Sequence, residues 1–435
     1  MEKNYLSHFS KHVSANMIGT IGLSLYIFAD TYFMSYYAGP MGLTALNIAI
    51  PVYGIIYSFA HMIGVGGGTN FSFSSAQGDY KKANEYFSIS ISYAVLIGIV
   101  IATFGFLFSE KLSLLLGANS ESIEMTNIYI KTIMSFSPFF ILNTTMITFL
   151  RYDNNPNLAM FAMLSSSIFN IIGDYVFMEY FHLSVFGAAL ATGIAPIVSI
   201  LIFLGHIIKK QGILKFQSIN FNVKELFKIS RLGISTAVYE LSQSLVTLSF
   251  NYLILGISGN MGIAAYGIIT NVGLIIMSMF NGLQQGMQPL ISRAHGVRDY
   301  IGEKIYLKYG IVFGIVLSVF VYVISFLNLD GLIRIFNSQN VKILYDLAKT
   351  GIIVYFLGFL PHGLNIAIIA YENATNNPRM SFILSLARGT ILSLLFAFVL
   401  SHYFGMLGIW LSFPLAEMVT LGLYVVFKKI LDKNM

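Results

Sequence analysis

Apolar stretches of about 20 residues recur along the whole chain, and each is long enough to cross the ~30 Å hydrocarbon layer of a bilayer. Only 10% of the 435 residues are charged, against about 25% in soluble domains. We therefore predict an all-α polytopic membrane protein with twelve transmembrane helices. The expected spans lie near 13–37, 43–72, 84–108, 124–150, 156–179, 186–208, 228–256, 262–292, 305–327, 345–371, 378–401 and 406–427.

The second half of the sequence repeats the first half in the same order. The segment GPMGLTALNI at 39–48 returns 220 residues later as GNMGIAAYGI at 259–268. The motif Asn-Asn-Pro at 154–156 returns at 376–378. Repeats of six spans in the same orientation indicate two halves related by an axis normal to the membrane.

The repeat predicts two pseudo-symmetric lobes of six helices each. We assign residues 1–208 to an N-terminal six-helix lobe and 229–435 to a C-terminal six-helix lobe. The basic segment 209–228 is the expected cytoplasmic linker. Two lobes that face each other across a cleft are the usual geometry of transport by alternating access.

Basic residues flank the expected spans unevenly. If the N-terminus lies inside, 19 Lys and Arg residues lie on the inner side and five on the outer side, and Arg388 lies within a span. Because an excess of Lys and Arg marks cytoplasmic loops, we expect both termini in the cytoplasm and a multi-pass protein of the inner (plasma) membrane. Contact with anionic lipids accounts for the net charge of +6, so we expect no nucleic-acid partner.

Several sequence motifs indicate a family when they are taken in order. They are FADTYFMSYYAGPMGLTALNIAIP (28–51), GVGGGTNFSFSSAQGDYKKANE (64–85), FNIIGDYVF (169–177), VFGAALATGIAP (185–196) and NGLQQGMQPLISRAHG (281–296). On two halves of six spans, these motifs resemble the MATE (multidrug and toxic compound extrusion) transporters, in particular their bacterial drug-exporting branch. The resemblance implies a cation-coupled antiporter that exports amphipathic, often cationic, drugs.

Two acidic residues lie inside expected spans of the first half. Asp30 and Asp174 both fall in the outer halves of their helices, so their carboxyl groups could converge. At the repeat offsets, their counterparts in the second half are Phe250 and Phe396. The duplicated fold therefore does not demand an acid at these positions, and acids inside membrane spans are candidates for function.

Other oxygen-bearing side chains accompany these two acids. Tyr26 precedes Asp30 by one helical turn, Asn170 precedes Asp174 by one turn, and Thr192 lies at a matching depth. Such oxygens suit Na⁺, whereas two close carboxylates can instead share a proton. The family resemblance also implies functional roles for these residues. We predict an ion-coupling site here, with buried acids that only stabilise the lobe as the alternative.

A second polar set lies near the middle of the C-terminal lobe. Glu240, Arg388 and Glu417 each lie far from both membrane faces, and the repeat does not duplicate them. They form a candidate cation site that competes with the first one. The alternative is an Arg388–Glu417 pair that neutralises itself, and Glu240 is then expected to lack a partner.

Aromatic residues are abundant, with 37 Phe and 26 Tyr. They suit a cavity for flat hydrophobic cations, which bind aromatic faces. The candidates for such a substrate cavity are Tyr36, Tyr37, Tyr53, Tyr57, Phe250 and Phe396.

Two further expectations rest on the positions of glycine and proline. The run GVGGG at 64–68 lacks the Lys-Ser/Thr of a phosphate-binding loop and predicts close helix packing. The segment KHVSANMIG at 11–19 has no proline, although many members of the family have one there. A proline-kinked first helix is therefore in doubt.

The polar residues show no nucleophile–base pair and no metal-ligand spacing, and the chain has no cysteine. We therefore expect no enzymatic activity, no metal and no cofactor beyond a coupling Na⁺ or H⁺. The predicted function is export of amphipathic small molecules by alternating access, by a protein that functions as a monomer. The alternatives are a lipid-linked oligosaccharide flippase of the same broader superfamily and, from a different class, a non-transporting membrane scaffold.

Overall fold

The computed structural model describes residues 4–209, 212–218, 223–337 and 341–433, and regular structure in these ranges is helical throughout. The elements in chain order are α1 (Tyr5–Ala76), α2 (Tyr80–Leu115), α3 (Ile123–Ser135), α4 (Ser137–Tyr152), α5 (Pro156–Tyr175), the π-turn η1 (Val176–Tyr180), α6 (Ser184–Ile208), α7 (Val223–Gly296), α8 (Tyr300–Leu327), α9 (Leu329–Phe336), α10 (Lys342–Tyr355), the 3₁₀ turn η2 (Phe356–Gly358), α11 (Phe359–Ala374), α12 (Pro378–Leu386), the π-turn η3 (Ala387–Ile391), α13 (Leu392–Phe404) and α14 (Met406–Lys433).

The described residues contain eleven helical segments that are long and apolar enough to cross a membrane. A twelfth span is formed by α3 and α4 together, which are bent by 48° where they meet. Pro138 lies in the first turn of α4, where a proline is tolerated because its missing N–H has no helical partner. The prediction of an all-α protein with twelve spans is therefore confirmed.

The helices α1 and α7 each contain two spans that meet at a glycine. Gly39 has φ 66° and ψ −162°, and Gly259 has φ 58° and ψ −152°. Glycine adopts this conformation without the steric cost that a side chain would add. Asn154 and Asn376, the other repeated motif, both have φ 60°. The sequence repeat thus corresponds to a repeated backbone conformation.

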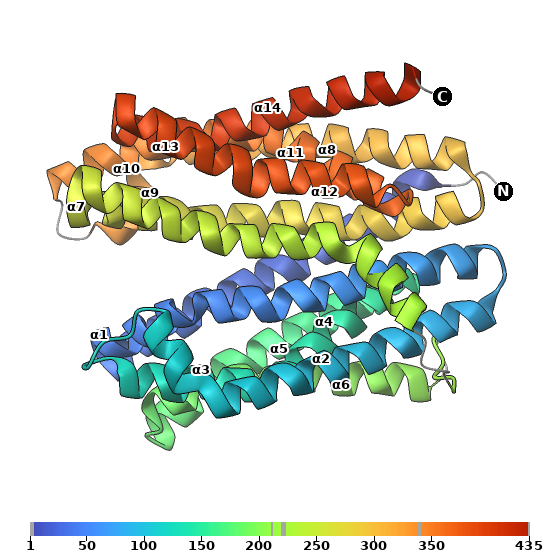
Figure 1. Ribbon diagram of the computed structural model, residues 1–435, viewed down its shortest axis with the longest axis horizontal. Helices are drawn as coiled ribbons and strands as arrows, with labels where there is room; N and C mark the ends of the chain where they lie inside the picture. Colours follow the sequence, from blue (N-terminus) through green and yellow to red (C-terminus); the bar gives the residue numbers. More distant parts are fainter. Residues whose placement is uncertain (1–3, 210–211, 219–222, 338–340, 434–435) are drawn as a thin grey trace.

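The helices form two groups, visible in Figure 1. We call α1–α6 the first lobe and α7–α14 the second lobe. Both chain termini lie at one end of the molecule, which we call the termini end, and the turns at Gly39 and Gly259 lie at the opposite end (Figure 1). Part of the segment 209–228 lies outside the described residues, so the division into domains stays a prediction.

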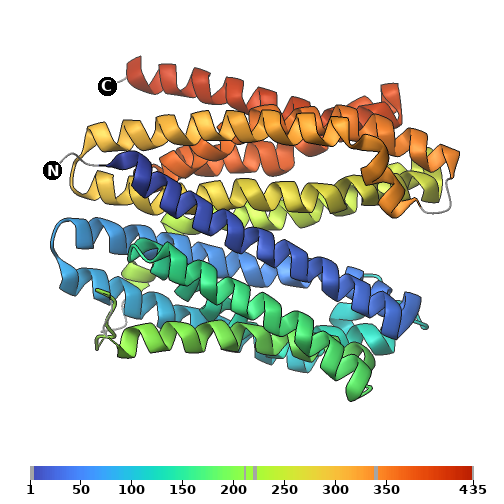
Figure 2. The same cartoon turned by 180° about the vertical axis from the view of Figure 1, so that it is seen from behind.

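The first span of α1 passes from one lobe to the other, as Figure 2 shows. Near the termini end, Phe9 and Val13 pack in a hydrophobic cluster with Met287 of α7. Further along, Met34 packs in the core of the first lobe with Ile133. Gly39 is the one position in α1 with non-helical backbone angles, so this span runs without a kink from Tyr5.

The described part of the linker, 212–218, is fastened to the first lobe by hydrogen bonds. The backbone N–H of Ile213 donates to Asp153 Oδ1 over 3.1 Å, and that of Lys215 donates to Asn84 Oδ1 over 2.7 Å. Burial raises the pKa of the Asp153 carboxyl, and the bonds from Ile213 and His206 oppose this shift.

Glycines bring the two lobes into backbone contact in the half of the molecule near the termini end. A Cβ atom at Gly66 would lie 1.9 Å from the carbonyl oxygen of Ile229, and one at Gly233 would lie 1.9 Å from that of Met62. The prediction of close packing for residues 64–68 is thus confirmed. Toward the turns at Gly39 and Gly259 the lobes diverge (Figure 1).

Candidate functional site

Asp30 and Asp174 are buried in the first lobe, with 5% and 0% of their surface exposed. Asp30 lies in the first span of α1, and Asp174 lies one residue before the end of α5. The π-helical turn η1 continues α5 directly and begins two residues after Asp174. The two carboxyl groups are close enough to interact electrostatically.

Oxygen atoms around these acids lack hydrogen-bond donors. Among the residues that the structure describes, no partner is found for either carboxylate oxygen of Asp174, for Asp30 Oδ1 or for Asn170 Oδ1. The amide nitrogen of Asn170 donates to Thr192 Oγ1 over 3.1 Å. Because an unpaired buried acceptor is costly, this group of oxygens is suited to holding a proton or a hard cation.

Tyrosines complete the surroundings of the two acids. Tyr26 interacts electrostatically with Asp30, and the fully buried Tyr129 interacts with both Asp30 and Asp174. The hydroxyl groups of Tyr129 and Tyr53 lie 3.0 Å apart. Tyr129 was not predicted. The sequence marks it only as one of the tyrosines inside the fourth expected span.

The structure thus gathers the predicted N-lobe residues in one place. Asp30 and Asp174 interact, Asn170 binds Thr192, and Tyr26 interacts with Asp30. Their role in ion coupling stays a prediction.

Arg388 and Glu417 form a buried ion pair in the second lobe. Nε and Nη2 of Arg388 both lie 3.0 Å from Glu417 Oε1, and the two residues are 4% and 2% exposed. Asn365 Nδ2 donates to Glu417 Oε2 over 2.7 Å. Arg388 lies in the π-turn η3, between α12 and α13. The structure therefore contains the pair that was the alternative to a cation site at these residues.

His362 joins this pair and was not predicted. Its Nδ1 lies 2.9 Å from Glu417 Oε1, and its ring packs edge-on against Phe280, with 4.9 Å between ring centroids. The sequence signal was the spacing of His362 and Asn365, which places both on one face of α11.

Glu240 pairs with a residue outside the Arg388–Glu417 pair. Its Oε1 lies 3.0 Å from His61 Nδ1, and His61 belongs to the first lobe. The expectation that Glu240 lacks a partner is therefore wrong. The candidate C-lobe site separates into a neutralised internal pair and a contact between the lobes.

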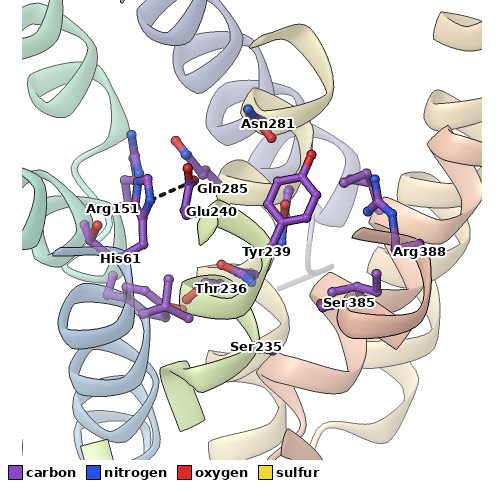
Figure 3. Close-up of a pocket in the computed structure, with 17 residues that line it drawn as sticks. His61, Arg151, Ser235, Thr236, Tyr239, Glu240, Asn281, Gln285, Ser385 and Arg388 are labelled. Atoms are coloured by element: carbon purple, nitrogen blue, oxygen red, sulfur yellow. Dashed lines mark ion pairs between the residues drawn. The ribbon is translucent and has the colours of Figure 1, made fainter. Parts of the chain in front are cut away.

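A cavity of about 740 Å³, counting space open to solvent, lies between the lobes beside the His61–Glu240 contact. Figure 3 shows this contact on one side and Arg388 on the other. Most of the lining residues carry polar groups, but apolar atoms make up the larger part of the exposed wall. The lining residues are His61, Val65, Thr148, Arg151, Tyr152, Ser235, Thr236, Tyr239, Glu240, Asn281, Gln284, Gln285, Gln288, Ile366, Ile369, Ser385 and Arg388.

The aromatic candidates lie elsewhere. None of Tyr36, Tyr37, Tyr53, Tyr57, Phe250 and Phe396 is among the described residues that line this cavity. Phe250 is 1% exposed and packs in the core of the second lobe, whereas Tyr36 is 69% exposed. Tyr57 contacts one of the lining residues: its ring stacks on that of His61 with 6.2 Å between ring centroids. The prediction that Phe250 lines the substrate cavity is therefore wrong, because a side chain in a packed core cannot line a cavity.

Comparisons with solved structures support the fold. One is described as "Outward-facing conformation of a multidrug resistance MATE family transporter of the MOP superfamily", with a TM-score of 0.91 and 20% identity over 97% of this chain and 95% of that one. Another, "Crystal structure of MATE in the bent conformation", has a TM-score of 0.90 over 98% and 95%. At this identity the likeness concerns the fold alone.

Sequence comparisons carry the family assignment. The chain is 27% identical to the multidrug export protein MepA of Staphylococcus haemolyticus (strain JCSC1435), over 97% of this chain and 92% of that protein. It is 26% identical to MepA of Staphylococcus aureus (strain MRSA252), over 95% and 90%. The MatE family model matches residues 16–176 and 236–399, which is well over half of the sequence. The chain therefore belongs to the MatE family.

Proposed function

We propose that this protein is a multidrug efflux transporter, which exports amphipathic, often cationic, compounds across the plasma membrane in exchange for Na⁺ or H⁺. Its relatives in Staphylococcus carry the name multidrug export protein. The cavity between the lobes offers a place where one compound could contact both of them. As a transporter, the chain needs no catalytic group, and we propose that one copy suffices.

The observation that carries the proposed coupling is the group of unpaired oxygens at Asp30, Asn170 and Asp174. Binding a cation or a proton there removes the cost of burying acceptors without donors. An ion drives a conformational change when its affinity differs between two states. Arrival of the ion in the first lobe thus favours one arrangement of the lobes and release of the drug, and loss of the ion on the other side resets the transporter.

The part of the cavity around Glu240 and Tyr239 has the chemistry of a site for organic cations, whereas Arg151, which has no carboxylate partner among the described residues, brings a positive charge to another part of the wall. Glu240 supplies a carboxylate, and Tyr239 supplies an aromatic face. Arg388 contributes little net charge, because Glu417 neutralises it. If the termini lie in the cytoplasm, the contact between the lobes at Gly66 and Gly233 closes the inner side, so a drug leaves toward the outside.

Transport by the purified protein in liposomes tests this proposal. A fluorescent organic cation is followed under a Na⁺ gradient and, separately, under a pH gradient. We expect one of the two gradients to drive transport, and Asp30→Asn and Asp174→Asn to abolish the driven component. Asp346→Asn, at an exposed position of α10, is the matched control and should transport normally. Full driven transport by both variants would refute the N-lobe site, and absence of transport under both gradients would refute the function.

A further inference from the structure

A second cavity lies at the termini end, between the end of α4 and the starts of α1 and α8, with α7 along its side. Its volume is about 1220 Å³, counting space open to solvent. It is separated from the first cavity by Arg151 and Tyr152, which line both. The mechanism proposed above makes no use of this cavity.

The walls of this cavity carry an excess of basic groups. Two arginines, Arg151 and Arg293, and two histidines, His8 and His12, line it. Asp299 is the one acidic residue among the described lining residues. Its carboxylate is already engaged, because it accepts hydrogen bonds from the N–H of Gly302 over 3.0 Å and from the hydroxyl of Tyr5 over 3.1 Å.

Arg151 is the lining residue whose charge the described part of the chain compensates least. It is 5% exposed, and Nη2 donates to the sulfur of Met163 over 3.3 Å. Its Nε has no hydrogen-bond partner, and no carboxylate lies within ion-pair distance, among the described residues. The C-terminal end of α4 stabilises part of the charge. Arg388, the other arginine buried in the spans, has a carboxylate partner, so Arg151 is the exception.

Donors from three helices converge on the cavity. Arg151 comes from α4 and Arg293 from α7. His8 comes from α1 and adds a ring N–H at the wall of the cavity. His12, also in α1, adds no donor: its Nε2–H donates to Asn154 Oδ1 over 2.8 Å, which leaves Nδ1 of the neutral ring as an acceptor without a partner in the described part of the chain.

We propose that this cavity binds a phosphate-bearing anion. A phosphate presents several acceptor oxygens in different directions, which matches donors that approach from three helices, and arginine binds phosphate by paired hydrogen bonds. The shared chemistry fits two sources, a soluble phosphate compound or the headgroup of an anionic phospholipid. Because Arg151 belongs to the first lobe and Arg293 to the second, the bound anion stabilises the arrangement in which the lobes touch at this end.

Binding to the purified full-length protein tests the proposal without reference to transport. In one arm, inorganic pyrophosphate is titrated into detergent-solubilised protein at constant ionic strength. In the other arm, the thermal midpoint is compared between nanodiscs of phosphatidylcholine alone and nanodiscs with added phosphatidylglycerol. Arg151→Gln is the test variant, and Arg379→Gln, an exposed position in α12, is the matched control.

We expect wild type and Arg379→Gln to respond alike in at least one arm, and Arg151→Gln to lose at least tenfold in affinity or most of the rise in midpoint. A response to pyrophosphate assigns a soluble ligand, and a response to phosphatidylglycerol alone assigns a lipid headgroup. If Arg151→Gln does not fold, Arg293→Gln, whose side chain is exposed, replaces it. No response in either arm, or an equal response by wild type and the variant, would overturn the site.

Discussion

His61 of the first lobe and Glu240 of the second lobe lie 3.0 Å apart, from Nδ1 to Oε1, at the edge of the cavity between the lobes. Their side chains are 23% and 31% exposed, so both remain accessible from the cavity. A cationic drug in the cavity can therefore replace the imidazole of His61 beside the carboxylate of Glu240.

Replacing Glu240 by glutamine should weaken the binding of cationic drugs. The amide keeps the size of the side chain but loses its charge, and a hydrogen bond to a charged group contributes about 1.5–3 kcal/mol. We expect the KM for a monovalent organic cation to rise about tenfold, which corresponds to ~1.4 kcal/mol. The KM for an uncharged substrate should change little. Initial rates of transport in proteoliposomes provide both values.

Glu225→Gln is a suitable control for this change. Glu225 is also in α7, but it pairs with Lys228 near the termini end, outside the cavity. An equal loss of cation binding in the two variants would show that the effect does not come from the cavity.

Asp174→Asn should stabilise the protein while it abolishes coupling. Both carboxylate oxygens of Asp174 lack partners in the described part of the chain, so the folded state bears the cost of burying them. A neutral amide lowers this cost, and we expect the free energy of unfolding to rise by about 1–3 kcal/mol. Thermal unfolding in detergent without a coupling ion measures the change. Exposed Asp346→Asn should have no effect, and a lower midpoint for Asp174→Asn would contradict the assignment.

Glu417→Gln should destabilise the second lobe strongly. The change leaves the Arg388 guanidinium buried without its carboxylate, which costs about 3–5 kcal/mol. Replacing both residues, as Arg388→Met with Glu417→Leu, removes the unpaired charge and should restore most of the stability. Denaturant unfolding of the single and double variants gives the coupling energy. Additive losses in the double variant would mean that the pair does not stabilise the lobe as a unit.

The sequence predicted the twelve spans because the length of an apolar helix is set by the thickness of the bilayer. It singled out Asp30 and Asp174 because the repeat replaces both with phenylalanine, and it offered the Arg388–Glu417 pair, from a shared depth in neighbouring helices, as the alternative to a cation site. The His61–Glu240 contact could not be predicted in this way. It joins two lobes, and the repeat contains no information on how one lobe packs against the other.

The same limit applies to the wall of the cavity. Phe250, an aromatic candidate for that wall, is the counterpart of Asp30, but equivalent positions in two lobes need not face the same space. In the second lobe this position points into the core, where Phe250 packs against Tyr266 with 5.6 Å between ring centroids. Only the packing of the lobes decides which face of a helix lines the cleft.

Gly66→Ala should prevent the lobes from closing at the termini end. The added Cβ would lie 1.9 Å from the carbonyl oxygen of Ile229, and that backbone atom cannot move independently of α7. To reach an ordinary contact distance, the helices must separate by roughly 1.5 Å, at a cost of about 1–3 kcal/mol for overpacking. We expect normal expression and loss of transport, because the state in which the lobes touch at this end is no longer accessible.

The absence of native cysteine allows this to be measured directly. Cysteines at Ala76 and Val297 report the closed state: Gly296, which precedes Val297, lies directly beside Ala76 of the other lobe, and a short bifunctional thiol reagent can bridge the two cysteines without a new side chain at the glycine. Cross-linking of this pair should be efficient in an otherwise unchanged protein and weak in the presence of Gly66→Ala. Gly256→Ala is the control, because no described atom lies within 4 Å of its Cβ position, and it should leave both cross-linking and transport intact. Equal cross-linking with and without Gly66→Ala would show that the glycine contact does not govern closure, because the lobes would then meet at Ala76 and Gly296 without it.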